Sequence, residues 1–434
     1  MKRLLLEKIS LRTLRVAVIG LGYVGLPLAV TFAEQGFHVT GIDVDQQKVD
    51  QANKGESYIS DIDNSTLQRL LDTGHLKFTS DFAALDEIDA VSICVPTPLR
   101  KTRDPDISYI LAATQQVRAH LHPGQLVILE STTYPGTTDE VVLPELAATG
   151  LQVGRDFFLA FSPERIDPGN TRFNTRNTPK VVGGITHDCT ELAQAYYGAA
   201  IETIVPASSA QVAEMTKLLE NTFRAVNIGL VNEIAIMCEK LHINVWEVID
   251  AAATKPFGFM RFLPGPGLGG HCIPVDPHYL SWKLKTLDYT ARFIQLADEI
   301  NSSMPHYVVE KVNHALNEQR RSFNSATVLV LGVAYKPNVG DVRESPALDI
   351  IRELQERKSV VLYNDEYVPS ITLHDRSTLQ SQPLSSGLLQ AADCVVIVTN
   401  HSYYDTNWIV QEARSIVDTR NMMQHEQHDK IICL

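Results

Sequence analysis

The sequence contains no apolar run long enough to cross a bilayer and no block of lysine or arginine. A transmembrane helix needs about 20 predominantly apolar residues, so we expect no membrane partner. Lys and Arg total 38 against 51 Asp and Glu, which gives a net charge of −13. Since so acidic a chain is a poor general binder of nucleic acid, we expect no nucleic-acid partner and a local site for any anionic ligand.

The chain also has few cysteines, six in 434 residues, and none has the paired spacing of a disulfide framework or a zinc site. The first 14 residues lack the apolar core and the small-residue cleavage site of a secretory signal. This pattern is typical of reduced thiols. It predicts a cytoplasmic protein with no metal.

Buried-strand patterns alternate with helical patterns over the first half of the chain. An apolar run at 15–20 ends at a glycine, a helical pattern follows, and 38–43 has the pattern of a second strand, which together form a βαβ unit. Further strand patterns lie at 90–95, 126–129 and 157–161. The alternation predicts an α/β fold with a doubly wound parallel sheet over roughly 1–205.

The pattern changes after residue 205. Residues 208–241 contain no proline and a single glycine, which predicts a helix on the order of 50 Å long, suited to a connector or a dimer spine. Helical patterns continue to about 319, and strand patterns return at 327–332, 359–365 and 393–399. We therefore expect two Rossmann-like domains joined by a long central helix and a helical region, with domains at 1–205, 206–320 and 321–434.

The first strand leads into Gly20-Leu-Gly22-Tyr23-Val24-Gly25. Such a turn, opening a helix inside a βαβ unit, is typical of a dinucleotide site, in which backbone amides face a pyrophosphate. The alternative is a purely structural turn. Asp43 ends the second strand, where its carboxylate can accept hydrogen bonds from a ribose diol, and this favours NAD over NADP. The nearby Lys48 could weaken that preference. The second α/β domain begins its turn at Gly332 without these glycines, and we expect no dinucleotide chemistry there.

The most informative segment is the Gly/Pro-rich loop 264–277, which contains Cys272 and Asp276. In a protein that binds a nicotinamide, a loop cysteine suggests covalent redox catalysis, because a thiolate can add to an aldehyde and form a thioester after hydride loss. A lone cysteine is more often a small buried residue, and Asp276 alone is more often a turn former.

Other polar residues occupy positions that suit the same chemistry. Lys217 and Asn221 are four residues apart on the predicted long helix and therefore share a face, where they could stabilise an oxyanion or simply be solvated. Glu164 follows a predicted strand, where it could act as a general base or as a charge at the N-terminus of a helix. Thr97 and Thr132 also follow strands, so they are candidates for the cofactor cleft.

Together these motifs resemble the nucleotide-sugar 6-dehydrogenases, the family of UDP-glucose and UDP-N-acetylhexosamine dehydrogenases. The resemblance runs nearly end to end, through segments 20–25, 95–98, 130–135, 162–165, 217–221, 269–276 and 336–345. It implies oxidation of C6 of a UDP-sugar to the carboxylate, with two NAD reduced per sugar. It also implies an NAD domain, a central dimerisation region and a C-terminal domain that binds UDP, in a homodimer or higher homo-oligomer.

The resemblance also implies roles for individual residues. Cys272 is the nucleophile, while Lys217, Asn221 and Asp276 hold the oxyanion and water. Thr132 and Glu164 serve water activation and thioester hydrolysis. Arg343 matches a position that reaches the cofactor, and the positions that match substrate contacts are Glu164, Arg165, Lys217, Asn221, Gly269 and Lys336. An arginine that binds the nucleotide in the UDP-glucose branch has no counterpart here, where 255–258 occupies the region, and Lys255 or Arg261 could substitute for it.

The strings at 265–276 and 130–136 resemble the UDP-N-acetylglucosamine branch, whose product feeds surface polysaccharide. The alternatives are a UDP-glucose 6-dehydrogenase, a catalytically silent nucleotide-binding scaffold, and a two-electron dehydrogenase of a small hydroxy acid. Intact Cys272, Lys217, Asn221 and Asp276 argue against the scaffold, and the cysteine loop argues against the two-electron enzyme.

Overall fold

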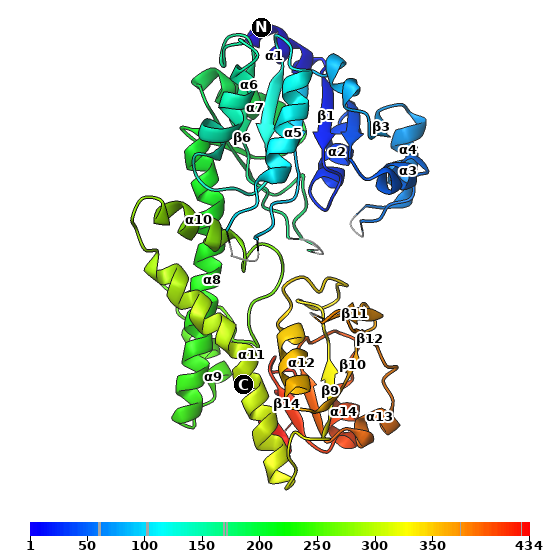
Figure 1. The fold of residues 1–434 in the computed structure, drawn as a ribbon, viewed down its shortest axis with the longest axis vertical. Coiled ribbons are helices and arrows are strands. Elements are labelled where there is room, and N and C mark those ends of the chain that lie inside the picture. Colours follow the sequence, from blue (N-terminus) through cyan, green and yellow to red (C-terminus); the bar gives the residue numbers. More distant parts are fainter. Residues whose placement is uncertain (60–61, 101–103, 168–169, 171, 374, 427) are drawn as a thin grey trace. The chain divides into compact units, whose positions relative to one another are not determined.

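The computed structural model describes residues 1–59, 62–100, 104–167, 170, 172–373, 375–426 and 428–434 (Figure 1). The chain divides into two compact units. The first unit comprises Met1–Glu220 and His278–Tyr289, and the second comprises Asn221–Pro277 and Thr290–Leu434.

The first unit is built on an eight-stranded sheet in the order β3-β2-β1-β4-β5-β6-β7-β8. The strands are β1 (Arg15–Ile19), β2 (His38–Ile42), β3 (Leu76–Thr79), β4 (Ala90–Ile93), β5 (Leu126–Leu129), β6 (Phe158–Phe161), β7 (Lys180–Gly184) and β8 (Ile204–Pro206). Neighbouring strands are parallel except β6 and β7, which are antiparallel. The strand order reverses at β1 beside β4, and doubly wound sheets bind nucleotides at such a switch point.

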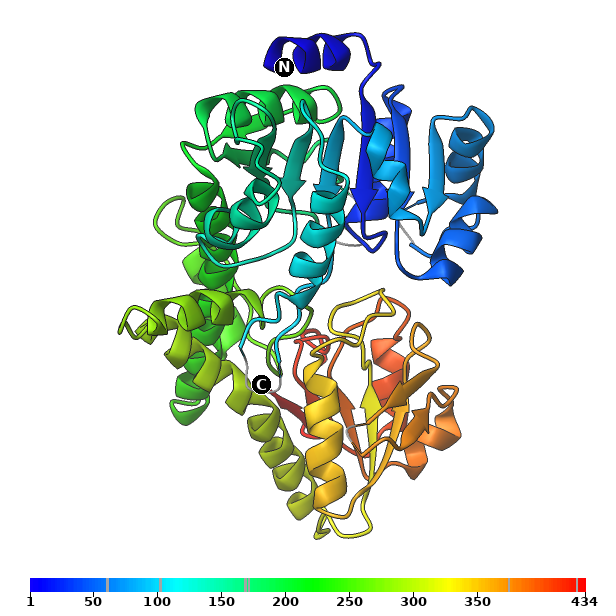
Figure 2. The same cartoon turned by 45° about the horizontal axis from the view of Figure 1, so that its top comes forward.

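Helices cover both faces of this sheet. Because side chains alternate along a strand, Val16 and Val18 of β1 pack into one apolar cluster and Ala17 and Ile19 into another. The helices of the unit are α1 (Lys2–Ser10), α2 (Gly25–Glu34), α3 (Gln46–Asn53), α4 (Asn64–Asp72), α5 (Ser108–Ala119), α6 (Leu143–Ala147) and α7 (His187–Gly198), with short turns η1 (Phe82–Glu87) and η2 (Thr138–Val142). Figure 2 shows α1, in dark blue, at the margin of this unit.

One long helix, α8 (Ala210–Lys240), begins in the first unit and ends in the second. Its 31 residues match the predicted helix to within two residues at either end and give a length of about 47 Å at 1.5 Å per residue. The helices that follow are α9 (Val245–Ala253), α10 (Asp276–Lys285), α11 (Arg292–Glu318), α12 (Pro346–Glu356), α13 (Ser386–Ala391) and α14 (Thr406–Glu412). Within the described ranges, no helix is long and apolar enough to span a membrane.

The second unit contains a parallel five-stranded sheet in the order β10-β9-β13-β14-β15 and an antiparallel pair, β11 and β12. Their bounds are β9 (Thr327–Leu331), β10 (Val360–Asn364), β11 (Ser370–Thr372), β12 (Thr378–Gln380), β13 (Cys394–Ile397), β14 (Ile416–Asp418) and β15 (Ile431–Cys433). Its central order repeats that around β1 in the first unit. The predicted α/β class, with two largely parallel sheets and a long helix, is confirmed, and the antiparallel pairing of β6 with β7 is the departure from the parallel sheet predicted over 1–205.

Candidate active site

The turn after β1 has three glycines that serve different purposes. A Cβ on Gly20, whose φ is +89°, would lie 2.6 Å from the carbonyl oxygen of Cys94, and one on Gly25 would lie 1.8 Å from the carbonyl oxygen of Gly20. Both positions therefore exclude any side chain. A Cβ on Gly22 would meet no atom within 4 Å, so packing inside the protein does not explain this glycine. Open space beside the start of α2 fits the close approach of a pyrophosphate.

Asp43 follows β2 and is directed at the same turn. Its Oδ2 accepts a hydrogen bond from the amide of Leu21 at 2.8 Å, and Oδ1 accepts one from the amide of Asp45 at 2.9 Å. Each carboxylate oxygen can accept a second hydrogen bond, so the group retains capacity for a ribose diol. The Lys48 ammonium is 3.9 Å from Oδ2. Half-exposed Tyr23 completes a turn that fits NAD.

Two loops border the switch point, and each contains one predicted cofactor residue. Thr97 follows β4, and its carbonyl oxygen accepts a hydrogen bond from the buried hydroxyl of Tyr279 at 3.0 Å. Thr132 follows β5, next to Ser131, whose hydroxyl donates to the carbonyl of Val95 at 2.8 Å. The side chain of Ser131 thus ties the second loop to the first.

Lys217 and Glu164 meet within the first unit. The ammonium of buried Lys217, on α8, donates to the backbone carbonyl of Glu164 at 2.6 Å. The Glu164 carboxylate accepts hydrogen bonds from the amides of Arg165 and Ile166, each at 2.7 Å. Burial alone would raise the pKa of Glu164, but nearby Lys180, the two amides and Lys217 hold it below its ordinary value. The carboxylate is therefore ionised at neutral pH.

Arg165 is engaged with a carboxylate on α8. Its guanidinium lies 2.6 Å from Oε1 of Glu220 and also donates to the carbonyl of Pro179 at 2.7 Å. The predicted substrate contact is therefore neutralised within its own unit, and an anionic ligand would have to compete with Glu220.

In the second unit, the loop 264–277 is fixed by neighbours on both sides. The amide of Gly265 donates to Oδ1 of Asn232 on α8 at 2.9 Å, and the amide of Gly270 donates to the carbonyl of Arg343 at 3.0 Å. A Cβ on Gly269 would lie 2.6 Å from the Cβ of Tyr335. The glycines thus let the loop lie against the C-terminal α/β fold.

Cys272 is half-buried at the turn that leads into α10. Its carbonyl oxygen accepts hydrogen bonds from the amides of Val275 at 3.1 Å and Asp276 at 2.8 Å. The Asp276 carboxylate in turn accepts a hydrogen bond from the side-chain amide of Asn221 at 2.5 Å, and both residues are buried. The second unit therefore brings Asn221, Asp276 and the cysteine loop together.

The remaining predicted site residues of the second unit have partners as well. Arg343 makes a two-pronged ion pair with Asp341, with a shortest separation of 2.6 Å. The Lys336 ammonium lies 5.8 Å from the ring centre of Tyr335. Arg261, on the segment after α9, pairs with Asp250 of α9 at 2.6 Å, and both side chains are about half exposed.

The second sheet has its own counterpart of Asp43 in Asp365. This fully buried carboxylate accepts hydrogen bonds from the amides of Val333 at 2.8 Å and Ala334 at 3.1 Å, and His401 Nε2 lies 2.9 Å from the same oxygen. Because three protein groups fill Oδ2, the amide of Tyr367 binds Oδ1 and the carboxylate is fully buried, Asp365 is not available to a ribose.

Sequence reasoning missed Arg420, which follows β14 at the carboxyl edge of the second sheet. Its Nε donates to the carbonyl of Val398 at 2.8 Å, and a Cβ on Gly265 would lie 2.7 Å from its Nη1. Burial lowers the pKa of Arg420 to about 10, against the opposing charge of Asp418. An arginine two residues after a buried strand is the signal that could have identified it.

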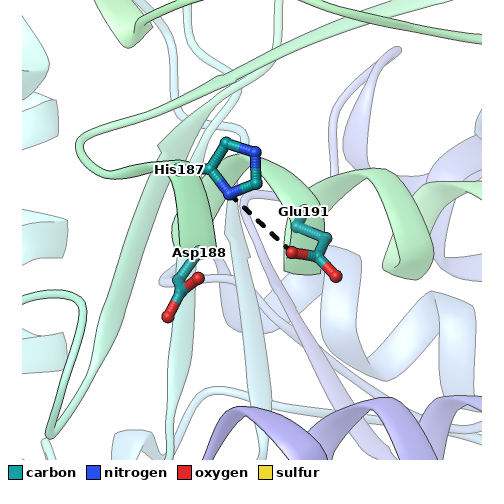
Figure 3. A group of neighbouring side chains, drawn as sticks. All are labelled: His187, Asp188 and Glu191. Carbon is teal, nitrogen blue, oxygen red and sulfur yellow. Dashed lines mark ion pairs between the residues drawn. The ribbon is translucent and has the colours of Figure 1, made fainter.

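One cluster outside these regions has the residue types of a metal site. His187, Asp188 and Glu191 lie together at the start of α7, with 3.8 Å between His187 Nδ1 and Glu191 Oε2 (Figure 3). The ammonium of Lys2 already binds Asp188 at 2.7 Å and Glu191 at 2.5 Å. The cluster serves to attach α1 to α7.

Comparison with known protein families matches three consecutive parts of the chain. Residues 14–201 match the NAD binding domain of the UDP-glucose/GDP-mannose dehydrogenase family, residues 211–303 its central domain, and residues 329–425 its UDP binding domain. The resemblance found in the motifs is thereby confirmed, as is NAD as the cofactor.

Individual relatives cover nearly the whole chain. A UDP-N-acetyl-D-glucosamine 6-dehydrogenase from Pseudomonas aeruginosa is 36% identical over 91% of this chain and 92% of its own. An NDP-N-acetyl-D-galactosaminuronic acid dehydrogenase from Ralstonia nicotianae is 35% identical over 94% and 96%. The solved structure of a UDP-D-ManNAc dehydrogenase from Pyrococcus horikoshii has a TM-score of 0.88 at 33% identity, over 97% of this chain and 99% of that one.

Proposed function

The chain belongs to the UDP-glucose/GDP-mannose dehydrogenase family, and from this premise we propose that it oxidises C6 of a UDP-N-acetylhexosamine to the uronic acid. UDP-N-acetylglucosamine is the substrate we favour, because the strings at 265–276 and 130–136 resemble that branch. The observation that carries the proposal is the hydrogen bond between buried Asn221 and Asp276 beside the loop of Cys272.

The reaction removes four electrons and requires a covalent stage. When bound, NAD accepts a hydride in each of two oxidations. After the first, the Cys272 sulfur adds to the C6 aldehyde and gives a thiohemiacetal, and loss of the second hydride gives a thioester. Water then attacks the thioester carbon, the carbon–sulfur bond breaks, and the products are the carboxylate, a proton and the restored thiol.

Each charged or polar side chain has a defined part in this scheme. Lys217 and Asn221 stabilise the oxygen that carries negative charge in the tetrahedral states. Asp276 orients the Asn221 amide. Thr132 and ionised Glu164 orient the water that attacks the thioester.

The remaining predicted site residues are assigned to binding of the UDP-sugar and the cofactor. We propose that Gly269, Lys336 and Arg165 contact the UDP-sugar, and that Arg420 offers its desolvated guanidinium to a phosphate, since arginine suits phosphate oxygens. Tyr23, Val24, Lys48, Thr97 and Arg343 are assigned to the cofactor. We also propose that Arg261 contacts the nucleotide, in which case its ion pair with Asp250 breaks when the ligand binds.

We further propose a cytoplasmic homodimer with domains at 1–205, 206–320 and 321–434. The support for self-association is an exposed apolar stripe on α8, where Phe223, Leu230 and Met237 are 44%, 53% and 45% exposed. Their seven-residue spacing is that of a helix pair that buries one seam. Sedimentation of the wild-type protein as a dimer, and of Leu230→Glu as a monomer, would support this assembly.

Trapping of the covalent stage tests the proposed chemistry. Glu164→Gln, incubated with NAD and UDP-N-acetylglucosamine and then quenched in acid, is expected to carry the sugar nucleotide on the peptide that contains Cys272. Cys272→Ser in the same experiment should carry none. Absence of any adduct, together with normal turnover by Cys272→Ser, would overturn the mechanism.

A further inference from the structure

The first unit buries a cluster of three charged side chains. The Lys180 ammonium lies 2.8 Å from Oε2 of Glu130 and 3.3 Å from Oε2 of Glu164, and the exposed fractions of the three side chains are 6%, 0% and 13%. Tyr197 donates its hydroxyl to the other oxygen of Glu130 at 2.6 Å. Removing charges from water costs several kcal/mol per ion, and apolar side chains would fill the same space without that cost.

The reversed strand β7 explains how Lys180 comes to this place. Strands β5 and β6 are parallel, so Glu130 and Glu164, just after them, lie at the same edge of the sheet. Strand β7 is antiparallel to β6, with Ala160 opposite Gly184 and Phe161 opposite Gly183. Continuing that register places Lys180, the first residue of β7, opposite Glu164. A parallel strand would have carried its first residue to the far edge.

We propose that Lys180 is a positioning residue for Glu164, whose ammonium fixes the orientation and the charge of that carboxylate for hydrolysis of the Cys272 thioester. The inference rests on the proposed function, in which Glu164 orients the attacking water. In that step the water oxygen bonds to the thioester carbon as the carbon–sulfur bond breaks. One proton of the water restores the thiol, and the other leaves to solvent from the new carboxylic acid.

The hydrogen bonds of Glu164 define which oxygen can serve the water. Each carboxylate oxygen has about two acceptor positions. Oε1 accepts from the amides of both Arg165 and Ile166, which fills it. Oε2 binds Lys180, which leaves one position on that oxygen. Because the side chain is 13% exposed, water can reach that position, and the ammonium determines where it points.

The charges around Glu164 also favour its ionised form. Lys180 from β7 and Lys217 from α8 both lower its pKa, while burial raises it. Glu130, after β5, shares the Lys180 ammonium, the buried thiol of Cys94 follows β4, and Arg165 is paired with Glu220. Without Lys180, two carboxylates would face each other in a largely dry site, and the pKa of Glu164 would rise.

The test compares Lys180→Met with Lys180→Arg. In Lys180→Met, we expect the acid limb of the kcat–pH profile to move up by about one unit or more and kcat at pH 7 to fall about tenfold or more. In a single turnover, two hydride equivalents should still be released quickly while the thioester accumulates on Cys272. Lys180→Arg should retain the wild-type acid limb. An unchanged acid limb with no accumulated thioester in Lys180→Met would overturn the inference.

Two further variants separate positioning from general stability. Lys311→Met removes a similarly buried lysine, 2.6 Å from Glu239 and 6% exposed, on α11, and should lower the melting temperature without moving the acid limb. The double variant Glu130→Gln with Lys180→Met keeps the net charge of the cluster. The acid limb of its kcat–pH profile should still lie above that of the wild type. If Lys180→Met fails to fold, this double variant tests the positioning role in its place.

Glu164→Gln distinguishes the inference from the function on which it rests. If the thioester is hydrolysed slowly in Glu164→Gln but at the wild-type rate in Lys180→Met, the positioning role of Lys180 alone is overturned. Undiminished hydrolysis in Glu164→Gln would overturn the role of Glu164 in the proposed function, and the inference with it.

Discussion

The side-chain amide of Asn221 donates a hydrogen bond to the carboxylate of Asp276 at 2.5 Å. Asn221 lies on α8 and Asp276 begins α10, so the bond joins two helices, and both residues are buried. An asparagine amide has two N–H donors. Since Asp276 accepts one, the other is held in a fixed direction, and a fixed donor is what stabilises a developing oxyanion without reorganisation.

Asn221→Asp keeps the shape of the side chain and removes its donors. It also places two carboxylates in contact, and such a pair cannot readily be ionised together. Losing one oxyanion donor costs on the order of 100-fold in kcat or more, so we expect at least that loss, with the Kd for NAD unchanged. The measurement is kcat by NADH absorbance. Asn317→Asp, at an exposed position of α11, should retain wild-type kcat.

NAD is expected to accelerate the alkylation of Cys272. The thiolate is the reactive form of a cysteine, and the positive charge of the nicotinamide ring favours it if the cysteine acts beside the cofactor. Labelling by iodoacetamide, followed by peptide mass spectrometry, measures the rate for each of the six cysteines separately. Equal rates at Cys272 with and without NAD would contradict a thiol that acts close to the cofactor.

Asp43→Ser is expected to weaken the preference for NAD over NADP. The buried carboxylate can accept bonds from a ribose diol and repels a 2′-phosphate. The kcat/KM for NAD should therefore fall about tenfold or more, while that for NADP stays level or rises. Asp45→Ser, at the neighbouring N-cap of α3, is the control. A wild-type cofactor ratio in Asp43→Ser would contradict the assignment.

Glu214 predicts a particular dependence of stability on pH. Burial raises the pKa of this carboxyl from 4.5 to about 7, although it accepts hydrogen bonds from the amides of Gly136 and Thr138. The folded state therefore binds a proton that the unfolded state has released between these two pH values. The contribution of Glu214 to the free energy of unfolding falls as the pH rises from 4.5 to about 7, by about 3 kcal/mol at 1.36 kcal/mol per unit.

Thermal melts of the wild type and of Glu214→Gln between pH 4.5 and 8 measure this contribution. The fall in melting temperature across that window should be smaller in Glu214→Gln, because the amide does not titrate. Glu202→Gln, at an exposed position, should follow the wild type. Parallel curves for all three proteins would show that Glu214 does not titrate in this range.

The sequence was sufficient to predict most of the architecture. Parallel strands buried on both faces have continuous apolar runs, and such runs at 15–20 and 327–332 predict β1 and β9. The helix α8 is predictable because few helix-breaking residues interrupt its sequence. Strand direction has no such signature. The run at 180–184 is β7, and nothing in its composition indicates that it runs antiparallel to β6.

The sequence also did not allow us to predict which charged residues form ion pairs with one another. Lysine and glutamate are usually exposed, so nothing marked Lys180 and Glu130, 50 residues apart, as a buried pair. The same applies to Arg165 and Arg261, whose ion pairs with Glu220 and Asp250 depend on tertiary structure. The glycine turn could be predicted because Gly20 and Gly25 answer a local steric requirement, while Gly22 leaves open space at the start of the helix.

The central claim is a four-electron oxidation of a UDP-N-acetylhexosamine, and the NADH yield per sugar tests it most directly. UDP-GlcNAc, UDP-GalNAc, UDP-ManNAc and UDP-glucose would each be supplied as the limiting reagent, with excess NAD, and NADH measured at completion. We predict two NADH per UDP-GlcNAc, formed in clear preference to the other sugars. Two NADH from UDP-glucose alone would contradict the substrate, and one or none from every sugar would contradict the chemistry.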